Sequence, residues 1–453
     1  MHVDIRKTLS KTMRRVWPEL AAIDRQAAHY QETSWYTPSE LAAYQARLLQ
    51  ELLAHCWSSV PYYRRLMEET GATRPGDTSL AQLPTLSKEQ IRVHFDELRS
   101  DDLDDRRWYV NSSGGSTGEP VRVIQDRDYA VRSEARKVVC FEMAGYEPGD
   151  YLALLWGSQR DILVGGVGPR AAVGSFLRNM QTMNAFRMTP ELMRSYLASL
   201  GRRPPRLLYA YGQAVFELAR YAQAHGISVT APGAIVTTSE TLYPYMRETI
   251  EAVFGCEVFD QYGSREVSCI AQECDQHQGL HLNLETLVVE ILDDDGAPCP
   301  PGVEGDVVIT SLLNRAMPLV RYRIGDRATA AAHLCACGRG LPLLDHVAGR
   351  GFDAIRRSDG TVIPGIYFLH FISVVYNRPW IAKFQVVQTD YDRIVMKVVS
   401  NGVEPTAEER EELAHIVHMA MGEECRTEIE LVDEIPNSES GKYRYTLSLL
   451  DEA

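Results

Sequence analysis

The sequence lacks any long apolar run. No stretch of its 453 residues approaches the roughly 20 apolar residues that a membrane-spanning helix needs. The N-terminal segment carries Lys7, Lys11, Arg14 and Arg15 and has no apolar core of signal-peptide length. These absences predict a cytoplasmic protein without a membrane segment.

An excess of basic residues is also absent. Lys and Arg number 47 against 61 Asp and Glu, which gives a formal net charge of -14. Such a charge disfavours general binding to nucleic acid or to anionic membranes. An anionic substrate would therefore need a local basic site. The apolar fraction of 45% and charged fraction of 24% are those of a globular protein. The length predicts roughly two to four domains.

Cysteine is scarce and odd in number. Nine cysteines in 453 residues exclude a disulfide scaffold and imply thiols or metal ligands. Cys56 and Cys140 have apolar neighbours in sequence, which predicts core positions. Cys274, Cys335 and Cys337 lie near turns that contain Gly or His.

The periodicity of apolar residues divides the chain into three regions that differ in expected secondary structure. Capping motifs at Thr37-Pro38-Ser39-Glu40 and at Thr406 with Glu409 predict helix starts. Helices are expected at 38–69 (two, broken near Pro61), 128–144, about 190–200 and 213–225, with buried strands at 151–156, 207–209 and 234–237. That alternation predicts an α/β region. Short strands at 287–292, 306–310 and 319–323 predict a β-rich subdomain. Strands at 384–387 and 393–399, with the helix after Thr406, predict a small α+β domain beyond a Gly-flanked junction near 350.

The stretch 112–120, SSGGSTGEP, is a candidate phosphate-binding loop. It holds four hydroxyl side chains and three glycines. Glycines let backbone N–H groups turn inward around phosphate oxygens, and hydroxyls add donors. The GxxxxGK[ST] spacing is absent, and Glu119 stands where a lysine would be expected. A flexible surface loop is the alternative.

Four further motifs follow in order. They are DQYGSRE at 260–266, YRIGD at 322–326, which is expected to end a strand on an acid, GRGFD at 349–353 and PNSESGK at 436–442. Together with the loop at 112–120, they resemble the adenylate-forming superfamily of acyl-CoA synthetases from about residue 90 to 445. The SSGGSTGEP loop, the short chain, Thr238-Ser239-Glu240 and the Cys/His elements most resemble the phenylacetate-CoA ligase branch.

The resemblance implies an α/β fold with a β-rich subdomain. A large adenylate-forming domain would span 1–350, with a zinc-bearing β-rich subdomain at about 267–348. A small, mobile α+β domain would form a C-terminal lid at 351–453. The amphipathic N-terminal helices leave a homodimer open.

The resemblance also implies roles for particular residues. ATP phosphates would lie on Ser112, Ser113, Gly114, Gly115, Ser116, Thr117 and Gly118. Ser239 and Glu240 would flank the adenine, Asp260 would meet its amino group, and Tyr262 would stack on it. Asp326 would accept the ribose hydroxyls with Arg350 nearby, and Glu266 and Thr117 would hold Mg²⁺. Lys442 would bridge the carboxylate and the α-phosphate; an exposed turn lysine is its alternative.

The implied reaction joins ATP to an aromatic carboxylic acid and passes the acyl group to CoA. An amine, a hydroxyl or a carrier-protein thiol is the alternative acceptor, and an inactive nucleotide-binding scaffold is a third reading. Two positions depart from the family pattern. Phe352 stands where the family has a hinge aspartate, and Glu119 replaces the loop lysine.

Four residues have the composition of a structural zinc site. Cys274 and His281 are followed by Cys335 and Cys337, and a Cys3His set suits tetrahedral zinc with no open position. Unpaired reduced thiols are the alternative. His277 is a possible substitute ligand, and Cys269 is expected in the core.

The acid pocket is assigned through the resemblance to residues beside the YG motif. Its candidate residues are Tyr209, Tyr211, Gly212, Ser239, Gly263 and Ser264. A flat ring would fit beside glycine and tyrosine. The alternative is that Tyr209 and Tyr211 are core residues on alternate sides of a strand.

Overall fold

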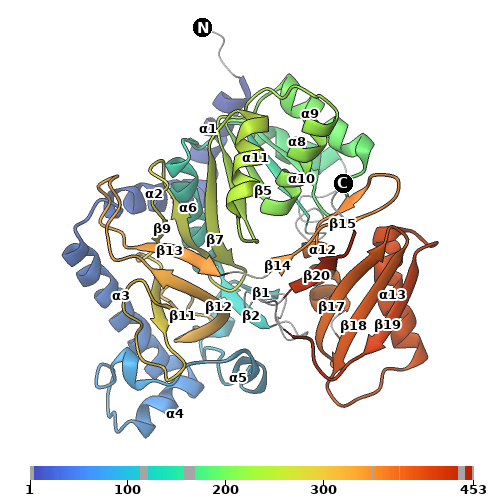
Figure 1. The fold of residues 1–453 in the computed structure, drawn as a ribbon. Helices are drawn as coiled ribbons and strands as arrows, with labels where there is room; N and C mark the ends of the chain where they lie inside the picture. Colours follow the sequence, from blue (N-terminus) through green and yellow to red (C-terminus); the bar gives the residue numbers. More distant parts are fainter. Residues whose placement is uncertain are drawn as a thin grey trace.

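The computed structural model describes residues 5–112, 121–157, 169–348, 351–376, 378–436 and 444–450. An eleven-stranded sheet organises the N-terminal part, and a five-stranded sheet organises the C-terminal part (Figure 1). This arrangement confirms the predicted α/β fold with a smaller α+β unit at the C-terminus. Within the described ranges, no helix is both long and apolar enough to cross a bilayer.

Helices lie against the faces of the sheets, and the first four helices form the N-terminal part of the chain. The α-helices are α1 (Ile5–Val16), α2 (Pro18–Thr33), α3 (Pro38–Ser59), α4 (Pro61–Glu69), α5 (Lys88–Val93), α6 (Arg127–Met143), α8 (Pro169–Leu177), α9 (Pro190–Arg202), α10 (Gly212–Ala224), α11 (Pro244–Phe254), α12 (Ile366–Phe368) and α13 (Ala407–Met421). Two short 3₁₀ turns, η1 (Leu80–Gln82) and η2 (Leu103–Asp105), and one π-helical segment, η3 (Leu369–Tyr376), complete the helical elements.

The strands fall into the two main sheets and two small hairpins. They are β1 (Trp108–Ser112), β2 (Arg122–Asp126), β3 (Leu152–Trp156), β4 (Met180–Asn184), β5 (Leu207–Tyr211), β6 (Ile235–Thr238), β7 (Val258–Ser264), β8 (Ser268–Glu273), β9 (Leu280–Leu282), β10 (Leu287–Leu292), β11 (Glu304–Ser311), β12 (Tyr322–Ala330), β13 (Leu343–Ala348), β14 (Gly351–Phe352), β15 (Ile355–Arg356), β16 (Val362–Ile363), β17 (Ile381–Asp390), β18 (Arg393–Ser400), β19 (Arg426–Leu431) and β20 (Arg444–Ser448).

The large sheet changes character at β7. Its order is β10-β11-β12-β13-β9-β8-β7-β6-β5-β3-β4. Strands β4, β3, β5, β6 and β7 pair in parallel, whereas β7 pairs antiparallel with β8. The inner strands β3 and β5 have apolar sequences, as strands covered on both faces require, whereas the edge strand β4 and the end of β7 are more polar. The β-rich stretch therefore extends the same sheet that the α/β stretch begins.

Capping residues in the sequence predicted two helix starts, and the structure confirms both. Thr37 and Thr406 both form capping boxes, with Glu40 and Glu409 respectively. A break at Val60–Pro61 separates α3 from α4, as predicted. The strand expected at 319–323 was wrong: β12 begins at Tyr322, because Arg321 has a φ of 52° that interrupts the extended backbone. The same strand continues past Asp326 to Ala330, so the acid lies within the strand.

The C-terminal unit rests against the parallel end of the large sheet. Its strand order is β14-β20-β17-β18-β19, and α13 packs beside this sheet. The segment 355–372 lies between the two parts (Figure 1), and Met188 and Val362 form a β-bridge there. One continuous hydrophobic cluster joins residues of both parts, including Phe186 and Phe371. The proposed boundary near 350 therefore separates two sheets that share a packed interface.

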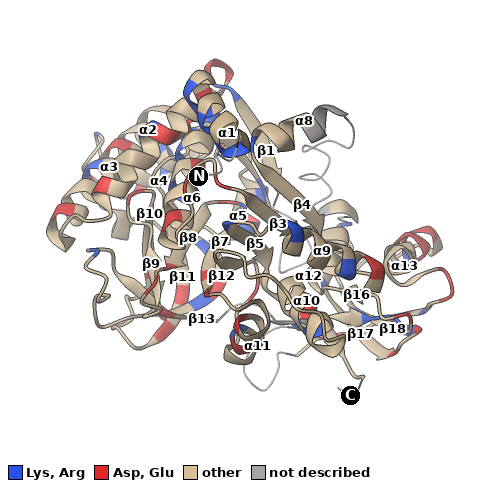
Figure 2. Cartoon of the chain, turned by 90° about the horizontal axis from the view of Figure 1, so that it is seen from above, with Lys and Arg blue, Asp and Glu red and all other residues tan. Residues whose placement is uncertain are grey.

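Charged residues are spread along the surface. In the cartoon of Figure 2, acidic and basic residues alternate along elements of both parts.

Candidate active site and Cys/His cluster

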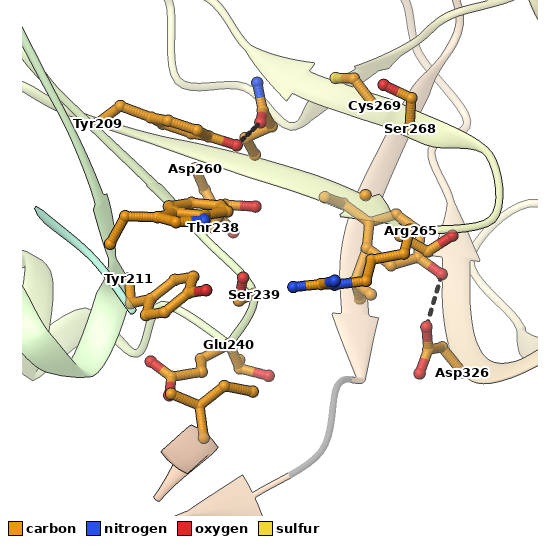
Figure 3. A pocket seen from close by; sticks show the side chains of 18 of the residues that line it. Tyr209, Tyr211, Thr238, Ser239, Glu240, Asp260, Arg265, Ser268, Cys269 and Asp326 are labelled. Carbon is orange, nitrogen blue, oxygen red and sulfur yellow. Dashed lines mark hydrogen bonds between the residues drawn. The ribbon is translucent and has the colours of Figure 1, made fainter. Parts of the chain in front are cut away.

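A cavity of about 390 Å³ lies at the carboxyl ends of β5, β6 and β7. Ligands of open α/β sheets bind at this end of the strands. Ten residues that the sequence assigned to a site line it (Figure 3): Tyr209, Tyr211, Ser239, Glu240, Asp260, Tyr262, Gly263, Ser264, Glu266 and Asp326. The fold thus brings together motifs that are far apart in the chain.

One side of the cavity is polar and well ordered by hydrogen bonds. The hydroxyl of Tyr262 donates to Asp326 Oδ2 at 2.9 Å (Figure 3). Tyr322 donates to Oε1 of the buried Glu266 at 3.0 Å. These contacts hold the Tyr262 ring and the carboxylates of Asp326 and Glu266 near β7, where the sheet changes from parallel to antiparallel pairing. Such a set can bind hydroxyl groups, a planar base or a hard cation.

Two carboxyl groups in this cavity have raised pKa values. Burial raises the pKa of Glu240 to about 7, although the backbone N–H of Gln213 donates to its Oε2 at 2.7 Å. Burial, together with the charge of Glu273, raises the pKa of Asp260 to about 7. Both groups therefore bind a proton more readily than exposed carboxyls do. Perturbed carboxyls in a cleft are typical of functional sites.

The turn that follows β6 is strained where it meets the cavity. Ser239 has a φ of 75°, a left-handed conformation that is unfavourable for a residue with a side chain. Strand β6 ends at Thr238, so this conformation directs the chain sharply into the cavity wall. Glu240 comes next and reaches the N-terminus of α10 through Gln213. Retained strain of this kind is common at ligand-binding positions.

The other side of the cavity is aromatic. The ring centroids of Trp156 and Tyr211 lie 4.4 Å apart, and those of Trp156 and Tyr209 lie 5.2 Å apart in a stacked arrangement. Phe186 stacks on Tyr211 at 6.3 Å and contacts His370 at 5.2 Å. These rings form a flat-sided slot next to the polar side. A planar apolar group fits such a slot.

The suggestion that Tyr209 and Tyr211 face alternate sides of a strand was wrong. Residues two apart in a strand point to the same face, and both rings line the cavity. The hydroxyl of Tyr209 donates to Gln261 Oε1 at 2.7 Å (Figure 3). Gly212 is not among the lining residues; it begins α10, and a Cβ there would meet Glu240 Oε2 at 3.8 Å.

Among the lining residues that escaped the sequence analysis are Trp156, Phe186, Ile366, Leu369 and His370. Trp156 ends a strand that was predicted, so its position beside β5 was the available signal. A Cβ on the neighbouring Gly157 would lie 2.1 Å from the Phe186 ring, which explains a small residue there. Ile366, Leu369 and His370 belong to the C-terminal unit, and only long-range packing places them at the cavity.

Other predicted site residues lie elsewhere. Ser112 is the last residue of β1 and does not line the cavity. Its neighbour Asn111 donates through Nδ2 to the carbonyl of Arg265, which ties β1 to the turn after β7. The following residues lie outside the described part of the chain: Ser113, Gly114, Gly115, Ser116, Thr117, Gly118, Arg350 and Lys442.

The structure gathers Cys274, His281, Cys335 and Cys337, with their ligand atoms all within 4.8 Å of one another. The Sγ atoms of Cys274 and Cys335 are 3.6 Å apart, and His281 Nε2 lies 3.4 Å from Cys274 Sγ and 3.5 Å from Cys337 Sγ. Tetrahedral zinc with Zn–S bonds of about 2.3 Å separates its ligand atoms by about 3.5 to 3.8 Å. The donor set and its spacing fit that geometry.

Two neighbouring residues behave differently from these four. His277 is turned away, and its Nδ1 lies 3.3 Å from Glu273 Oε2. Cys269 is buried in the core, as expected, with its Sγ 3.3 Å from that of Cys140.

Burial lowers the pKa of His281 to about 4, so its imidazole is neutral at pH 7, the form that binds metals.

Comparisons with known proteins agree with this arrangement. The CapK C-terminal domain family matches residues 355–448. Protein CapK of Staphylococcus aureus is 23% identical over 422 residues, which cover 90% of each chain. Phenylacetate-coenzyme A ligase of Thermus thermophilus is 26% identical over 328 residues, which cover 70% of this chain and 72% of the relative.

A solved structure has the same fold. The structure of 2-hydroxyisobutyryl-CoA ligase in complex with 2-HIB-AMP and CoA, in the thioesterification state, superposes with a TM-score of 0.60. It is 18% identical, and the superposition covers 92% of this chain and 91% of that one. The likeness extends through both sheets.

Proposed function

We propose that this chain is an adenylate-forming, acyl-CoA synthetase-like enzyme of the phenylacetate-CoA ligase branch, which activates an aromatic carboxylic acid with ATP and transfers the acyl group to CoA. The observation that carries the proposal is a single cavity with a polar half around Tyr262 and an aromatic half around Tyr211. The polar half would take the nucleotide, and the aromatic half would take the acid.

The nucleotide assignment follows from the chemistry of the polar half. Tyr262 offers a ring face for adenine, and its hydroxyl is fixed by Asp326. The carboxylate of Asp326 is an acceptor group that can receive hydrogen bonds from ribose hydroxyls. Asp260, with its raised pKa, is placed to meet the adenine amino group. The Ser/Gly loop that begins at Ser112 would hold the phosphates.

The reaction needs charge neutralisation at phosphorus. A carboxylate oxygen attacks the α-phosphorus of ATP, the bond to the β-phosphate oxygen breaks, and pyrophosphate leaves. Lys442 would bridge the carboxylate and the α-phosphate and so offset the repulsion between two anions. Glu266 presents a carboxylate to the cavity and, with Thr117, would hold Mg²⁺, which supplies further charge stabilisation when bound. The thiol of CoA then attacks the acyl carbon and AMP departs.

An aromatic acid is favoured by the shape and composition of the slot. Trp156, Phe186, Tyr209 and Tyr211 provide ring faces, and apolar contact with them stabilises a planar group. Ser239, in the strained turn after β6, lines the same cavity. The carboxylate of the acid would lie at the junction between the two halves, beside the α-phosphate.

The Cys3His cluster is proposed as a structural zinc site. Cys274 follows β8, His281 lies in β9, and Cys335 and Cys337 lie in the connection between β12 and β13. Four protein ligands leave no coordination position for a substrate. The metal would therefore hold the β12–β13 connection against β8 and β9.

The alternative to CoA is a second class of acyl acceptor. The C-terminal unit, which matches the CapK family, faces the acid pocket through Leu369 and His370. An enzyme with this unit could pass the acyl group to an amine, a hydroxyl or a carrier-protein thiol.

The experiment that tests the proposed function is product identification by mass spectrometry. Purified protein is incubated with ATP, Mg²⁺ and a panel of benzoic, phenylacetic, cinnamic and amino-substituted aromatic acids, with CoA or with an amine or hydroxy acid. A thioester formed only with CoA supports the proposal. An amide or ester in its place supports the second acceptor class, and acyl-AMP absent under every condition contradicts adenylation of these acids.

A further inference from the structure

Two thiols that the proposed reaction does not use lie together at the cavity wall. Cys269, near the start of β8, lines the cavity (Figure 3), and Cys140, in α6, is fully buried beside it. Their Sγ atoms are 3.3 Å apart. The two residues are far apart in the sequence, so the fold brings these sulfurs together.

A buried polar network holds the pair in place. Asn283 Nδ2 donates to the carbonyl of Cys269 at 3.0 Å and lies 3.8 Å from Cys140 Sγ. Asn283 Oδ1 accepts from Nε of the buried Arg136 at 2.6 Å. Arg136 and Cys140 both belong to α6, so one asparagine side chain fixes this helix against the strand that carries Cys269. The two sulfurs are therefore held at a short separation.

The surroundings of the two sulfurs give them different roles. The hydrogen bond from Cys269 and the positive charge of Arg136 lower the pKa of the Cys140 thiol, although burial opposes them. The thiolate is the nucleophilic form of cysteine, so this environment favours attack by Cys140 on an oxidised sulfur beside it. Cys269 is the thiol that a small oxidant in the cavity would meet. A thiol with a resolving cysteine next to it is typical of redox-sensitive sites.

We propose that Cys140 and Cys269 form a reversible disulfide that reshapes the cavity wall when hydrogen peroxide enters the cavity. Cys269 Sγ attacks one peroxide oxygen, the O–O bond breaks, and the thiol proton leaves with the departing hydroxide as water. Cys140 Sγ then attacks the sulfenic sulfur, the S–O bond breaks, and the hydroxyl group leaves with the Cys140 proton as a second water. Two thiols are thus oxidised to one disulfide while one peroxide is reduced to two waters. A dithiol reductant reverses the bond by exchange.

This disulfide would displace one wall of the cavity. An S–S bond is about 2.05 Å long, so the sulfurs must approach by about 1.3 Å. Cys269 pairs with Gly263 of β7, and a Cβ on Gly263 would lie 3.3 Å from Cys269 Cα, so the two strands are already close. The preceding Ser268 has a φ of 66° and also lines the cavity. Movement of Cys269 toward α6 would therefore move a strained segment that faces the ligand.

The inference goes beyond the proposed function, because the disulfide can form whatever the substrate is. Its effect on turnover rests on the proposed function. The bond and its effect are therefore measured separately, the bond by peptide mapping and the effect by the rate of pyrophosphate release.

The test treats the purified full-length protein with a small excess of hydrogen peroxide and maps its peptides by mass spectrometry without reduction. We expect Cys140 joined to Cys269, in a linked pair of peptides whose mass is two hydrogen atoms below the sum of its parts. Pyrophosphate release with an accepted acid should fall about 10-fold or more, because a displacement of about 1 Å in a substrate site can cost that much. Dithiothreitol should restore the rate.

Cys140→Ser removes the resolving thiol without changing a residue that lines the cavity. The reduced variant should keep the wild-type rate, form no linked pair, and carry a sulfenic acid at Cys269 that dimedone traps after peroxide treatment. The wild-type peptide map decides the chemistry even if this variant does not fold. Cys256→Ser is the matched control, because Cys256 is a half-buried thiol that follows α11. It should keep both the linked pair and the loss of rate.

The other outcomes contradict the inference. A map without the Cys140–Cys269 pair overturns it, and so does oxidation confined to Cys274, Cys335 and Cys337. A linked pair with an unchanged rate of pyrophosphate release overturns the control of the cavity. If the reduced, unsubstituted protein releases no pyrophosphate with any acid, the proposed function fails, while the peptide map still decides whether the disulfide forms. The two failures are therefore distinguishable.

Discussion

Nη2 of Arg356, in β15, lies 2.7 Å from both carboxylate oxygens of Glu217, in α10. The Glu217 side chain is 4% exposed, so this contact neutralises a carboxylate at the interface between the two parts of the chain. Nearby, the N–H of Gly365 donates to Gln213 Oε1 at 3.1 Å. The ion pair and this hydrogen bond hold the segment that leads to Leu369 and His370 against the cavity.

Breaking the Arg356–Glu217 pair should loosen that segment. In Arg356→Ala, a buried carboxylate loses its partner, and we expect a cost of about 2 kcal/mol at this interface. The Gly365 amide is the reporter, because its protection from hydrogen exchange depends on the docked position. A double-mutant cycle with Glu217→Ala, read from that amide, should give a coupling of similar size.

The Arg378–Glu412 pair provides the matched control. Its atoms are 2.9 Å apart, but both side chains are about 40% exposed and both belong to the C-terminal unit. Removing it should alter Gly365 exchange little, since exposed pairs contribute 0 to ~1 kcal/mol. Equal effects from the two pairs would contradict the assignment of Arg356 to the interface.

His370 should influence which acid is accepted. The residue is buried, lines the cavity and contacts Phe186, so His370→Ala removes one wall of the aromatic slot. We expect the KM for a small aromatic acid to rise about 10-fold, with AMP affinity unchanged. Val375→Ala is the control, because Val375 lies in the same η3 segment and is 57% exposed. A similar KM change in both variants would argue against a wall made by the C-terminal unit.

The sequence predicted more of the residues in the polar half of the cavity than in the aromatic half. Asp260, Tyr262, Glu266 and Asp326 were found because each sits in a short motif with a fixed residue pattern. Phe186 and His370 carry no such pattern. They reach the cavity only because segment 355–372 packs against the parallel strands, and long-range packing leaves no local signature.

The same distinction applies to secondary structure. Helix starts at Thr37 and Thr406 were predictable because capping depends on residues within one turn. The start of β12 was not, because the left-handed conformation at Arg321 accompanies tertiary bonds to Glu290 and to the carbonyl of Leu83. The Cys/His set was predictable in composition, but the distances that fit zinc required the fold.

Zinc should be present in the purified protein at one ion per chain. Cys335→Ser should lower the zinc content below half and the melting temperature by on the order of 5 °C, because the β12–β13 connection loses its tether. Metal content is measured by mass spectrometry and melting by calorimetry. Cys299→Ser is the control, since Cys299 is a half-buried thiol outside the cluster. If the unsubstituted protein contains no stoichiometric zinc and melts at the same temperature as Cys335→Ser, the proposed zinc site is wrong.

Asp260 should make stability depend on pH. Its folded pKa, about 7, lies above the usual value for an aspartate, so the unfolded state releases the proton first as pH rises. Folding stability is therefore lost between pH 4 and 7. Asp260→Asn removes this titration and should gain stability relative to the wild type across that window. The gain should be about 1 kcal/mol, reduced from the full shift because the group lines a cavity that water can enter.

Thermal melts of both proteins at pH 4, 5.5, 7 and 8 check this prediction. The difference should grow through the window and stay constant above pH 7. A constant difference at all four values would show that Asp260 titrates normally.

The central claim is adenylation of an acid, and acid-dependent release of pyrophosphate from ATP tests it most directly. We expect release with at least one aromatic acid of the panel, faster in the presence of CoA, and a loss of about 100-fold or more in Lys442→Ala. Release that is independent of acid, or that proceeds at the wild-type rate in Lys442→Ala, would contradict the account.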